Sequence, residues 1–258
     1  MSAKSQRRKG KGGGGGKGGG GGGAALRSEE TAEYKEFKDK MTYGGMEYEG
    51  DGSEQIKFFG EYSNYDELID SMTYEQREAF EDYWCPGHFM RGQQYRGFDG
   101  MSRTDQEVTR RMDEVLDKTT LERGVVVTRL TTSELILGAG KKFGTTAELQ
   151  AMEGKQVLSK GALSTGAAAE GLEIGSRRGS SKTSEVKIHI PGGSKGAGMW
   201  IGDYRVNFWG ERQREFIINR DSVFRVGRTV FDSKRGVNVT HIYWEGLTEH
   251  DYGSRGRR

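Results

Sequence analysis

The chain has 258 residues, 33% of them hydrophobic and 30% charged, and its 40 basic and 38 acidic side chains give a formal net charge of +2. This balance excludes a polycation, so any affinity for nucleic acid has to be local. The single cysteine, Cys85, excludes an intrachain disulfide, and no apolar run is long enough to span a membrane. Because the basic N-terminus is followed by glycine instead of the apolar stretch of a signal peptide, we expect a cytoplasmic or virion-associated protein.

Residues 1–24 are almost entirely Gly, Lys, Arg and Ser. Such a segment has nothing to bury and much backbone entropy to lose, which predicts a disordered, flexible tether. The alternative is a basic arm that contacts nucleic acid through Arg7, Arg8, Lys9 and Lys11. The same two interpretations apply to the basic tail at residues 251–258.

Residues 25–119 are predicted to form a helical lobe. TAEYKEFKDKM and DELIDSMTYEQREAFEDYW have apolar residues at helical spacing, and Thr73 with Gln76 three residues later predicts a helix start inside the second stretch. A Gly- and aromatic-rich break follows. SRTDQEVTRRMDEVL then predicts an amphipathic helix that buries Val108, Met112, Val115 and Leu116.

Residues 120–250 are dominated by β-branched and aromatic runs between turn residues: GVVVTRL, KGALST, SEVKIHIPGG, REFIINRDSVFRVGRTVFD and GVNVTHIYWEG. Helices followed by strands, without alternation of the two, predict an α+β fold with a mixed or antiparallel two-sheet core.

Two further motifs are interpreted as structural. GAGKKFG at 138–144 has the wrong spacing for a dinucleotide loop and no βαβ context, and GGSKGAG at 192–198 lacks the ending of a phosphate loop. Cys85 and His88 are three residues apart, but the other histidines are scattered, so no metal site is expected.

Three polar groups on predicted strands remain as candidates for a site. Strand alternation puts Gln213 and Glu215 on one face with Ile217, at the start of an apolar strand. Arg129 lies on the face of Val125 and Val127, where a guanidinium is costly unless it meets an acidic side chain or an anionic ligand. Taken singly, each of these residues can be interpreted as a polar side chain at an exposed strand end or as part of a functional site.

The third piece is the Ser164-Thr165 pair, in GALST at 161–165. In order along the chain, VVVTRL (125–130), GALST, VKIHIPGGSKGAG (186–198) and QREFIINRDSVFRV (213–226) resemble the Arg, Ser-Thr-Ser, Glu signature of the mono-ADP-ribosyltransferase toxin family. The versions in bacteriophage head-associated proteins and bacterial exoenzymes are the most similar.

The resemblance implies a transferase that uses NAD and no metal. Arg129 would grip the phosphates or adjacent ribose of NAD, and Glu215 would stabilise the charge that develops as nicotinamide leaves. Ser164, also at the NAD site, would hold the Glu215 carboxylate, with Thr165 shaping the strand beside the cofactor.

Two positions depart from the family pattern. Gly166 replaces the last serine of Ser-Thr-Ser, and Gln213 stands two residues before Glu215, where arginine-specific members have glutamate. The resemblance therefore implies a macromolecular acceptor other than arginine, such as a host protein side chain, or guanine bases of DNA. A catalytically silent phage module that binds nucleic acid, or NAD hydrolysis with water as acceptor, are the alternatives.

Overall fold

The computed structural model describes residues 65–84, 97–166, 172–173, 184–202 and 215–252. Its helical elements are α3 (Tyr65–Ser71), α4 (Tyr74–Trp84), the 3-10 turn η1 (Phe98–Gly100), α6 (Arg103–Leu116), α7 (Glu134–Leu137) and α8 (Thr146–Gln150). Its strands are β1 (Val125–Thr131), β2 (Gln156–Ser159), β3 (Leu163–Gly166), β4 (Leu172–Glu173), β5 (Ser184–Ile190), β6 (Gly198–Gly202), β7 (Glu215–Ile218), β8 (Ser222–Asp232) and β9 (Val237–Leu247). The expected tail over residues 1–24, the expected helix in TAEYKEFKDKM, and the Cys85–His88 turn lie outside the described residues.

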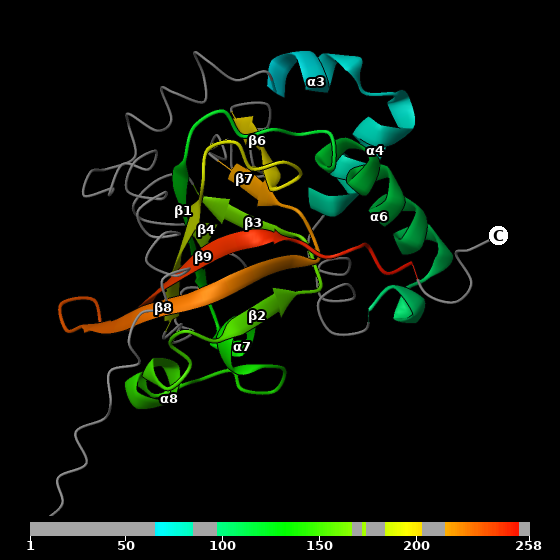
Figure 1. Ribbon diagram of the computed structural model, residues 1–258. Helices are drawn as coiled ribbons and strands as arrows, with labels where there is room; N and C mark the ends of the chain where they lie inside the picture. Colours follow the sequence, from blue (N-terminus) through cyan, green and yellow to red (C-terminus); the bar gives the residue numbers. More distant parts are fainter. Residues whose placement is uncertain (1–64, 85–96, 167–171, 174–183, 203–214, 253–258) are drawn as a thin grey trace, which may run out of the picture.

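Side-chain caps fix the starts of the helices that precede the sheet. The predicted capping box of α4 is confirmed, because Gln76 N donates to Thr73 Oγ1 at 3.2 Å and Thr73 N donates to Gln76 Oε1 at 3.0 Å. Ser102 caps α6 by accepting a hydrogen bond from Asp105 N at 3.1 Å. Helices α3, α4 and α6 gather beside one end of the sheet (Figure 1), and α4 packs against α6.

The described strands form one nine-stranded sheet in the order β2-β8-β9-β5-β1-β3-β7-β6, with β4 beside β1. Within these strands, β1–β4 and β5–β9 pair parallel and the other pairs are antiparallel. The partners Thr128 and Gly166 join β1 to β3 and so link the strands on the two sides. The predicted α+β class with a mixed sheet is confirmed. The two expected sheets are joined into a single hydrogen-bonded sheet by the pairing of β1 with β3.

One hydrophobic core joins the helices to the sheet. Phe80 of α4 and Leu116 of α6 belong to the same buried cluster as Phe216, Phe224 and Ile242 of the sheet, and each of these side chains is at most 2% exposed. Burial of this kind fixes strand positions, because interiors are as densely packed as organic crystals. No helix within the described ranges has the length and apolarity that crossing a bilayer requires.

Candidate active site

Strands β3 and β7 bring Ser164 and Glu215 onto one face of the sheet. In their antiparallel register Gly166 lies opposite Glu215, and Ser164 lies opposite Ile217. Directly paired residues project to the same face, which makes Ser164 and Glu215 diagonal neighbours. Gly166, which replaces the third residue of the Ser-Thr-Ser pattern, puts no side chain directly opposite Glu215.

Arg129 joins this pair from β1. Its guanidinium is buried, with the residue 6% exposed, and Nη1 donates a 2.7 Å hydrogen bond to the backbone carbonyl of Ser164. A buried guanidinium requires such partners because removing its charge from water is costly. The bond crosses from β1 to β3 and holds Arg129 against the strand that carries Ser164.

Tyr83, on the last turn of α4, is a site residue that sequence reasoning missed. Its hydroxyl lies 3.0 Å from Ser164 Oγ, and Tyr83, Ser164 and Glu215 are all at most 4% exposed. The signal in the sequence was slight: Tyr83 shares a helix face with the apolar residues Ala79 and Phe80, and such a tyrosine is usually core. Helix α4 therefore contributes a polar group to a site that otherwise consists of strands.

Arg129 and Glu215 lie close enough to the hydroxyl of Tyr83 to influence its pKa. Burial and, after it, the negative charge of Glu215 raise the pKa of Tyr83 above its usual value. The hydrogen bond with Ser164 and the positive charge of Arg129 act in the opposite direction. The structure thus assembles Tyr83, Arg129, Ser164 and Glu215 into one buried polar cluster, and Tyr83 stays protonated in it at neutral pH.

Thr165 points to the other face of β3. It is fully buried, and its Oγ1 donates a 2.6 Å hydrogen bond to the backbone carbonyl of Phe216, its partner on β7. This bond ties β3 to β7 next to Glu215. The hydroxyl of Thr165 therefore braces the strand pair, and its expected place beside the cofactor stays a prediction.

A cavity of about 370 Å³ opens beside Arg129. Its lining comes from β1, α7, β2, β3 and the segments that flank them. The lining residues are Arg129, Thr131, Thr132, Glu134, Leu135, Ile136, Leu137, Gly138, Ala139, Met152, Val157, Leu158, Ser159, Lys160 and Leu163. Gly138 and Ala139 belong to GAGKKFG, so that motif contributes a wall of this cavity.

Local hydrogen bonds fix the acidic residue of the cavity lining, Glu134. Glu134, at the start of α7, accepts from Thr132 Oγ1 at 3.0 Å and from Gly140 N at 3.1 Å. Among the described lining residues, Arg129 and Lys160 are basic and Glu134 is acidic, while α7, Met152 and Val157 supply apolar surface. Two cations, one fixed carboxylate and an apolar wall suit a ligand that combines anionic, hydroxyl and ring groups.

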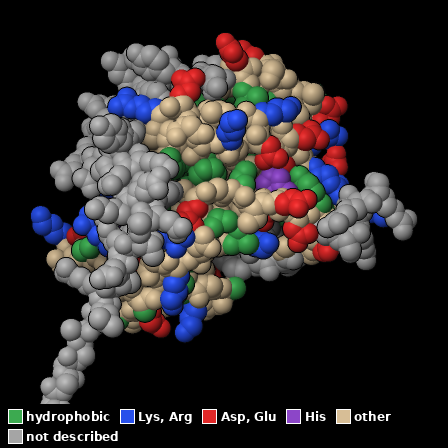
Figure 2. Space-filling model, viewed as in Figure 1, with side chains coloured by type: hydrophobic (Ala, Val, Ile, Leu, Met, Phe, Trp, Pro, Cys, Tyr) green, Lys and Arg blue, Asp and Glu red, His purple; other side chains and the backbone are tan. Residues whose placement is uncertain are grey.

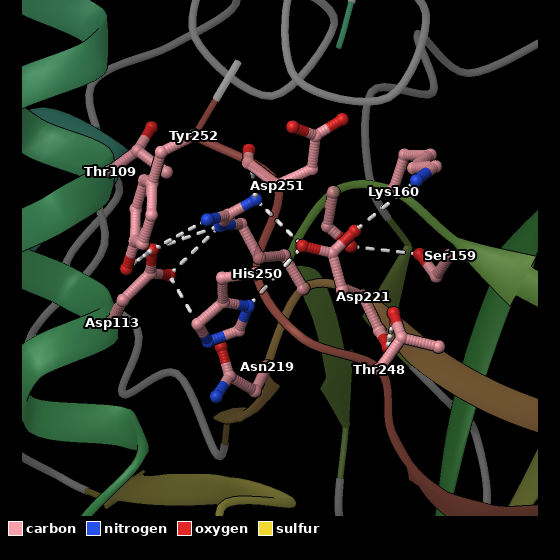
Figure 3. Close-up of polar contacts among 12 residues, drawn as sticks. Thr109, Asp113, Ser159, Lys160, Asn219, Asp221, Thr248, His250, Asp251 and Tyr252 are labelled. Carbon is pink, nitrogen blue, oxygen red and sulfur yellow. Dashed lines mark hydrogen bonds and ion pairs between the residues drawn. The ribbon is translucent and has the colours of Figure 1, made fainter. Parts of the chain in front are cut away.

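A buried ionic network follows β7 at the turn into β8. Arg220 Nε lies 3.0 and 2.9 Å from the two carboxylate oxygens of Asp113 on α6, and its Nη1 lies 2.7 Å from Asp221 Oδ2. His250 Nδ1 lies 3.2 Å from Asp221 Oδ2 (Figure 3). Its Nε2 lies 2.9 Å from Asp117 Oδ1, so His250 bridges the two carboxylates. The network ties the end of the strand that carries Glu215 to the helices.

The end of the described chain packs onto this network. Tyr252 donates from its hydroxyl to Asp113 Oδ2 at 3.0 Å, and its ring meets that of Phe98 edge to face. Figure 2 shows acidic and basic side chains gathered around a histidine on this side of the molecule. Tyr252, in the segment predicted to be a basic tail, thus contacts α6 and η1.

The histidine in the network is held in its charged form. Burial opposes the charge of His250, but the hydrogen bonds to Asp117 and Asp221, with the charge of Asp113, outweigh it and raise the pKa of His250 to about 9. At neutral pH the network therefore contains an imidazolium as well as the guanidinium of Arg220.

Several predicted site residues lie outside the described part of the chain. Gln213, the residue that the resemblance relates to the choice of acceptor, falls in the range 203–214. The same range contains Tyr204, Phe208 and Trp209, for which the resemblance implies contact with the acceptor, with packing on the sheet as the alternative. Their placement stays a prediction. The other predicted site residues, Arg129, Ser164, Thr165 and Glu215, all lie within the described ranges.

No protein-family model and no curated protein matches the chain. Solved structures do: Plx2a, an ADP-ribosyltransferase toxin from Paenibacillus larvae, is 19% identical and is similar over 75% of this chain and 96% of that one, with a TM-score of 0.58. An ADP-ribosyltransferase from Clostridium botulinum is 14% identical over 77% and 98% of the two chains, also with a TM-score of 0.58. C3stau2 from S. aureus, solved with NAD, is 14% identical over 75% and 96%, with a TM-score of 0.52. The chain therefore has the fold of the ADP-ribosyltransferase toxins.

Proposed function

We propose that this chain is an NAD-dependent mono-ADP-ribosyltransferase that transfers ADP-ribose to a macromolecular acceptor and releases nicotinamide. One observation carries the proposal: Arg129, Ser164 and Glu215, which come from three different strands, form one buried cluster in a chain with the fold of ADP-ribosyltransferase toxins. Three polar groups buried together are costly, and a scaffold without chemistry has no need to retain them.

The cavity beside Arg129 fits parts of a dinucleotide. Its basic residues Arg129 and Lys160 suit phosphate, the fixed carboxylate of Glu134 suits ribose hydroxyls, and the apolar wall from α7, Met152 and Val157 suits a base. NAD has these groups, which supports NAD as the substrate. We propose that NAD binds with its phosphates, ribose and base at these three parts of the cavity.

Glu215 is the proposed catalytic residue. As the bond between the nicotinamide nitrogen and ribose C1′ breaks, the electron pair of that bond leaves with nicotinamide, and positive charge develops on the ribose. The acceptor atom then forms a bond to C1′ with its lone pair, and the proton on the acceptor atom passes to solvent. A fixed carboxylate next to the ribose stabilises that charge, and in a site with little water such stabilisation amounts to several kcal/mol.

Ser164 and Tyr83 are proposed to position Glu215. Tyr83 and Ser164 share a hydrogen bond in which either hydroxyl can be the donor. In the proposed arrangement Tyr83 donates to Ser164 Oγ, and Ser164 donates onward to the Glu215 carboxylate on the same sheet face. Arg129 fixes the backbone of Ser164 from the other side. Preorganised hydrogen bonds of this kind keep a catalytic group in one orientation.

The acceptor is proposed to be a side chain other than arginine on a host protein. Gln213, two residues before Glu215, supports this choice because the resemblance associates glutamine there with acceptors other than arginine. Guanine in DNA and water are the competing acceptors.

The experiment that tests the proposal supplies NAD labelled in its adenylate half to the protein together with a cell lysate. Transfer to protein by the wild type, absent in Glu215→Gln, is the expected result. Label in nucleic acid would identify the guanine acceptor, and free labelled ADP-ribose would identify water. If neither protein consumes NAD and the wild type binds DNA through residues 1–24, a silent nucleic-acid-binding module replaces the enzyme.

A further inference from the structure

Lys160 lies at the boundary between the cavity and the ionic network. It follows β2 directly and lines the cavity, and its side chain is 47% exposed. Its Nζ is 3.7 Å from Asp221 Oδ1, on a side chain that is only 1% exposed (Figure 3). The Lys160 ammonium therefore has the buried carboxylate of Asp221 on one side and the cavity on the other.

The two basic groups of the described cavity lining differ in how firmly they are held. Arg129 is buried and donates at 2.7 Å to the Ser164 carbonyl. Lys160 is half-exposed and makes only a long ion pair. An ammonium at the end of a flexible stem is a compact charge that can move to meet a phosphate, whereas a buried guanidinium is fixed.

Asp221 holds Lys160 beside the cavity through a long ion pair. Asp221 Oδ2 lies 2.7 Å from Arg220 Nη1 and 3.2 Å from His250 Nδ1, both closer than Lys160 is to Oδ1. Because the 3.7 Å contact with Oδ1 is longer than a hydrogen bond, the Lys160 ammonium can turn toward a ligand in the cavity.

The backbone around Lys160 is also braced. Ser159 Oγ donates a 2.8 Å hydrogen bond to the carbonyl of Gly161, which closes the β2–β3 turn around Lys160. Ser159 is 3% exposed and lines the same cavity. The turn therefore presents Lys160 from a fixed backbone, four residues before Ser164.

We propose that Lys160 binds the diphosphate of the dinucleotide substrate and is its second cation beside Arg129. The proposal rests on the proposed function and names a residue of this chain that contributes to the same site. A diphosphate carries two negative charges, and one buried arginine committed to a backbone carbonyl leaves one of them to be met.

The test uses ADP, which carries the diphosphate, and adenosine, which lacks it, as calorimetric probes of the full chain. Lys160→Met keeps the length of the side chain and removes its charge. Lys141→Met is the matched control, since Lys141 also makes a long ion pair, 4.0 Å from Glu148, and lies outside the cavity lining.

We expect Lys160→Met to weaken ADP binding about tenfold, to leave adenosine binding unchanged, and to raise the KM for NAD more than it lowers kcat, because the phosphate contact exists in ground and transition states alike. The difference should shrink in high salt. Equal ADP affinity of wild type and Lys160→Met would overturn this inference alone. A wild type that binds neither ADP nor NAD would overturn the proposed function and the inference together.

Discussion

The hydroxyls of Tyr83 and Ser164 lie 3.0 Å apart in a buried position, although 81 residues separate them in sequence. One belongs to the last turn of α4 and the other to the strand that pairs with the strand of Glu215. The helices therefore do more than cover the core. They supply a polar group that contacts β3, the strand beside Glu215.

Removing only the hydroxyl of Tyr83 tests this positioning role. Tyr83→Phe keeps the ring in the core but leaves Ser164 without one hydrogen-bond partner, so we expect the free energy of unfolding to fall by about 1 kcal/mol. The turnover number for NAD should fall about tenfold, with a smaller change in KM, because Glu215 loses orientation and the phosphate contacts remain.

Tyr252→Phe is the control for the loss of a tyrosine hydrogen bond in general. Its hydroxyl donates to Asp113 Oδ2 at 3.0 Å, away from Ser164. It should lose similar stability and retain turnover. Equal losses of kcat in the two variants would show that stability, and not orientation, is what Tyr83 supplies.

Gly198 is required where β6 meets β7. Its φ is +152°, and a Cβ there would lie 2.2 Å from the carbonyl oxygen of Ile217. Gly198→Ala should cost about 2–4 kcal/mol, since the backbone of β7 has to move. Gly193→Ala, at φ +81° with nothing within 4 Å of the added carbon, isolates backbone strain and should cost about 1 kcal/mol. Chemical denaturation measures the loss of unfolding free energy in both variants. Equal losses would show that Gly198 is not required for steric reasons.

Arg220 and Arg225 should differ greatly in how much they contribute to the free energy of unfolding, because only Arg220 pairs with buried carboxylates. Arg220→Met leaves Asp113 and Asp221, which are 2% and 1% exposed, without their guanidinium, and should cost about 3–5 kcal/mol. Arg225→Met breaks a partly exposed pair with Glu245 and should cost less than about 1 kcal/mol. Chemical denaturation of both variants measures these losses of unfolding free energy. A similar loss in both would mean that the buried network contributes no more to stability than a surface ion pair.

His250 makes stability depend on pH in the alkaline range. Its pKa is raised to about 9 in the fold, so its contribution is fully present below about pH 6.5, the ordinary pKa of histidine, and is lost as pH rises through 9. Because the site is partly solvated, we expect a loss of about 1–2 kcal/mol over this range.

His250→Gln provides the comparison for that pH effect. It lacks the titrating imidazole, so its free energy of unfolding should be lower than that of the wild type at pH 6.5 and should change less up to pH 10. Parallel curves for the two proteins, measured in urea at each pH, would show that other groups cause the loss.

Local patterns in the sequence were sufficient for the longer elements. The capping pair Thr73 and Gln76 marks the start of α4, and the spacing of Val108, Met112 and Val115 identifies the buried face of α6. The short elements β2, α7 and α8 were not predicted, because four or five residues give too little periodicity to distinguish a strand from a turn.

The candidate site was predictable where its residues lie on strands in a recognisable order. Arg129, Ser164 and Glu215 were identified that way, and the structure brings them together. Tyr83 looked like an ordinary core residue, and the pairing of Asp113 with Arg220 joins residues 107 positions apart. Contacts between helix and sheet at such separations depend on tertiary packing, which no local pattern encodes.

Release of nicotinamide from NAD by purified wild type and Glu215→Gln measures the proposed catalytic role of Glu215. The substitution keeps the shape of the side chain and removes its charge, so thermal stability and NAD binding should change little. We expect nicotinamide release to fall by on the order of 10²–10³-fold in Glu215→Gln. Equal release by the two proteins, with NAD bound by both, would contradict that role.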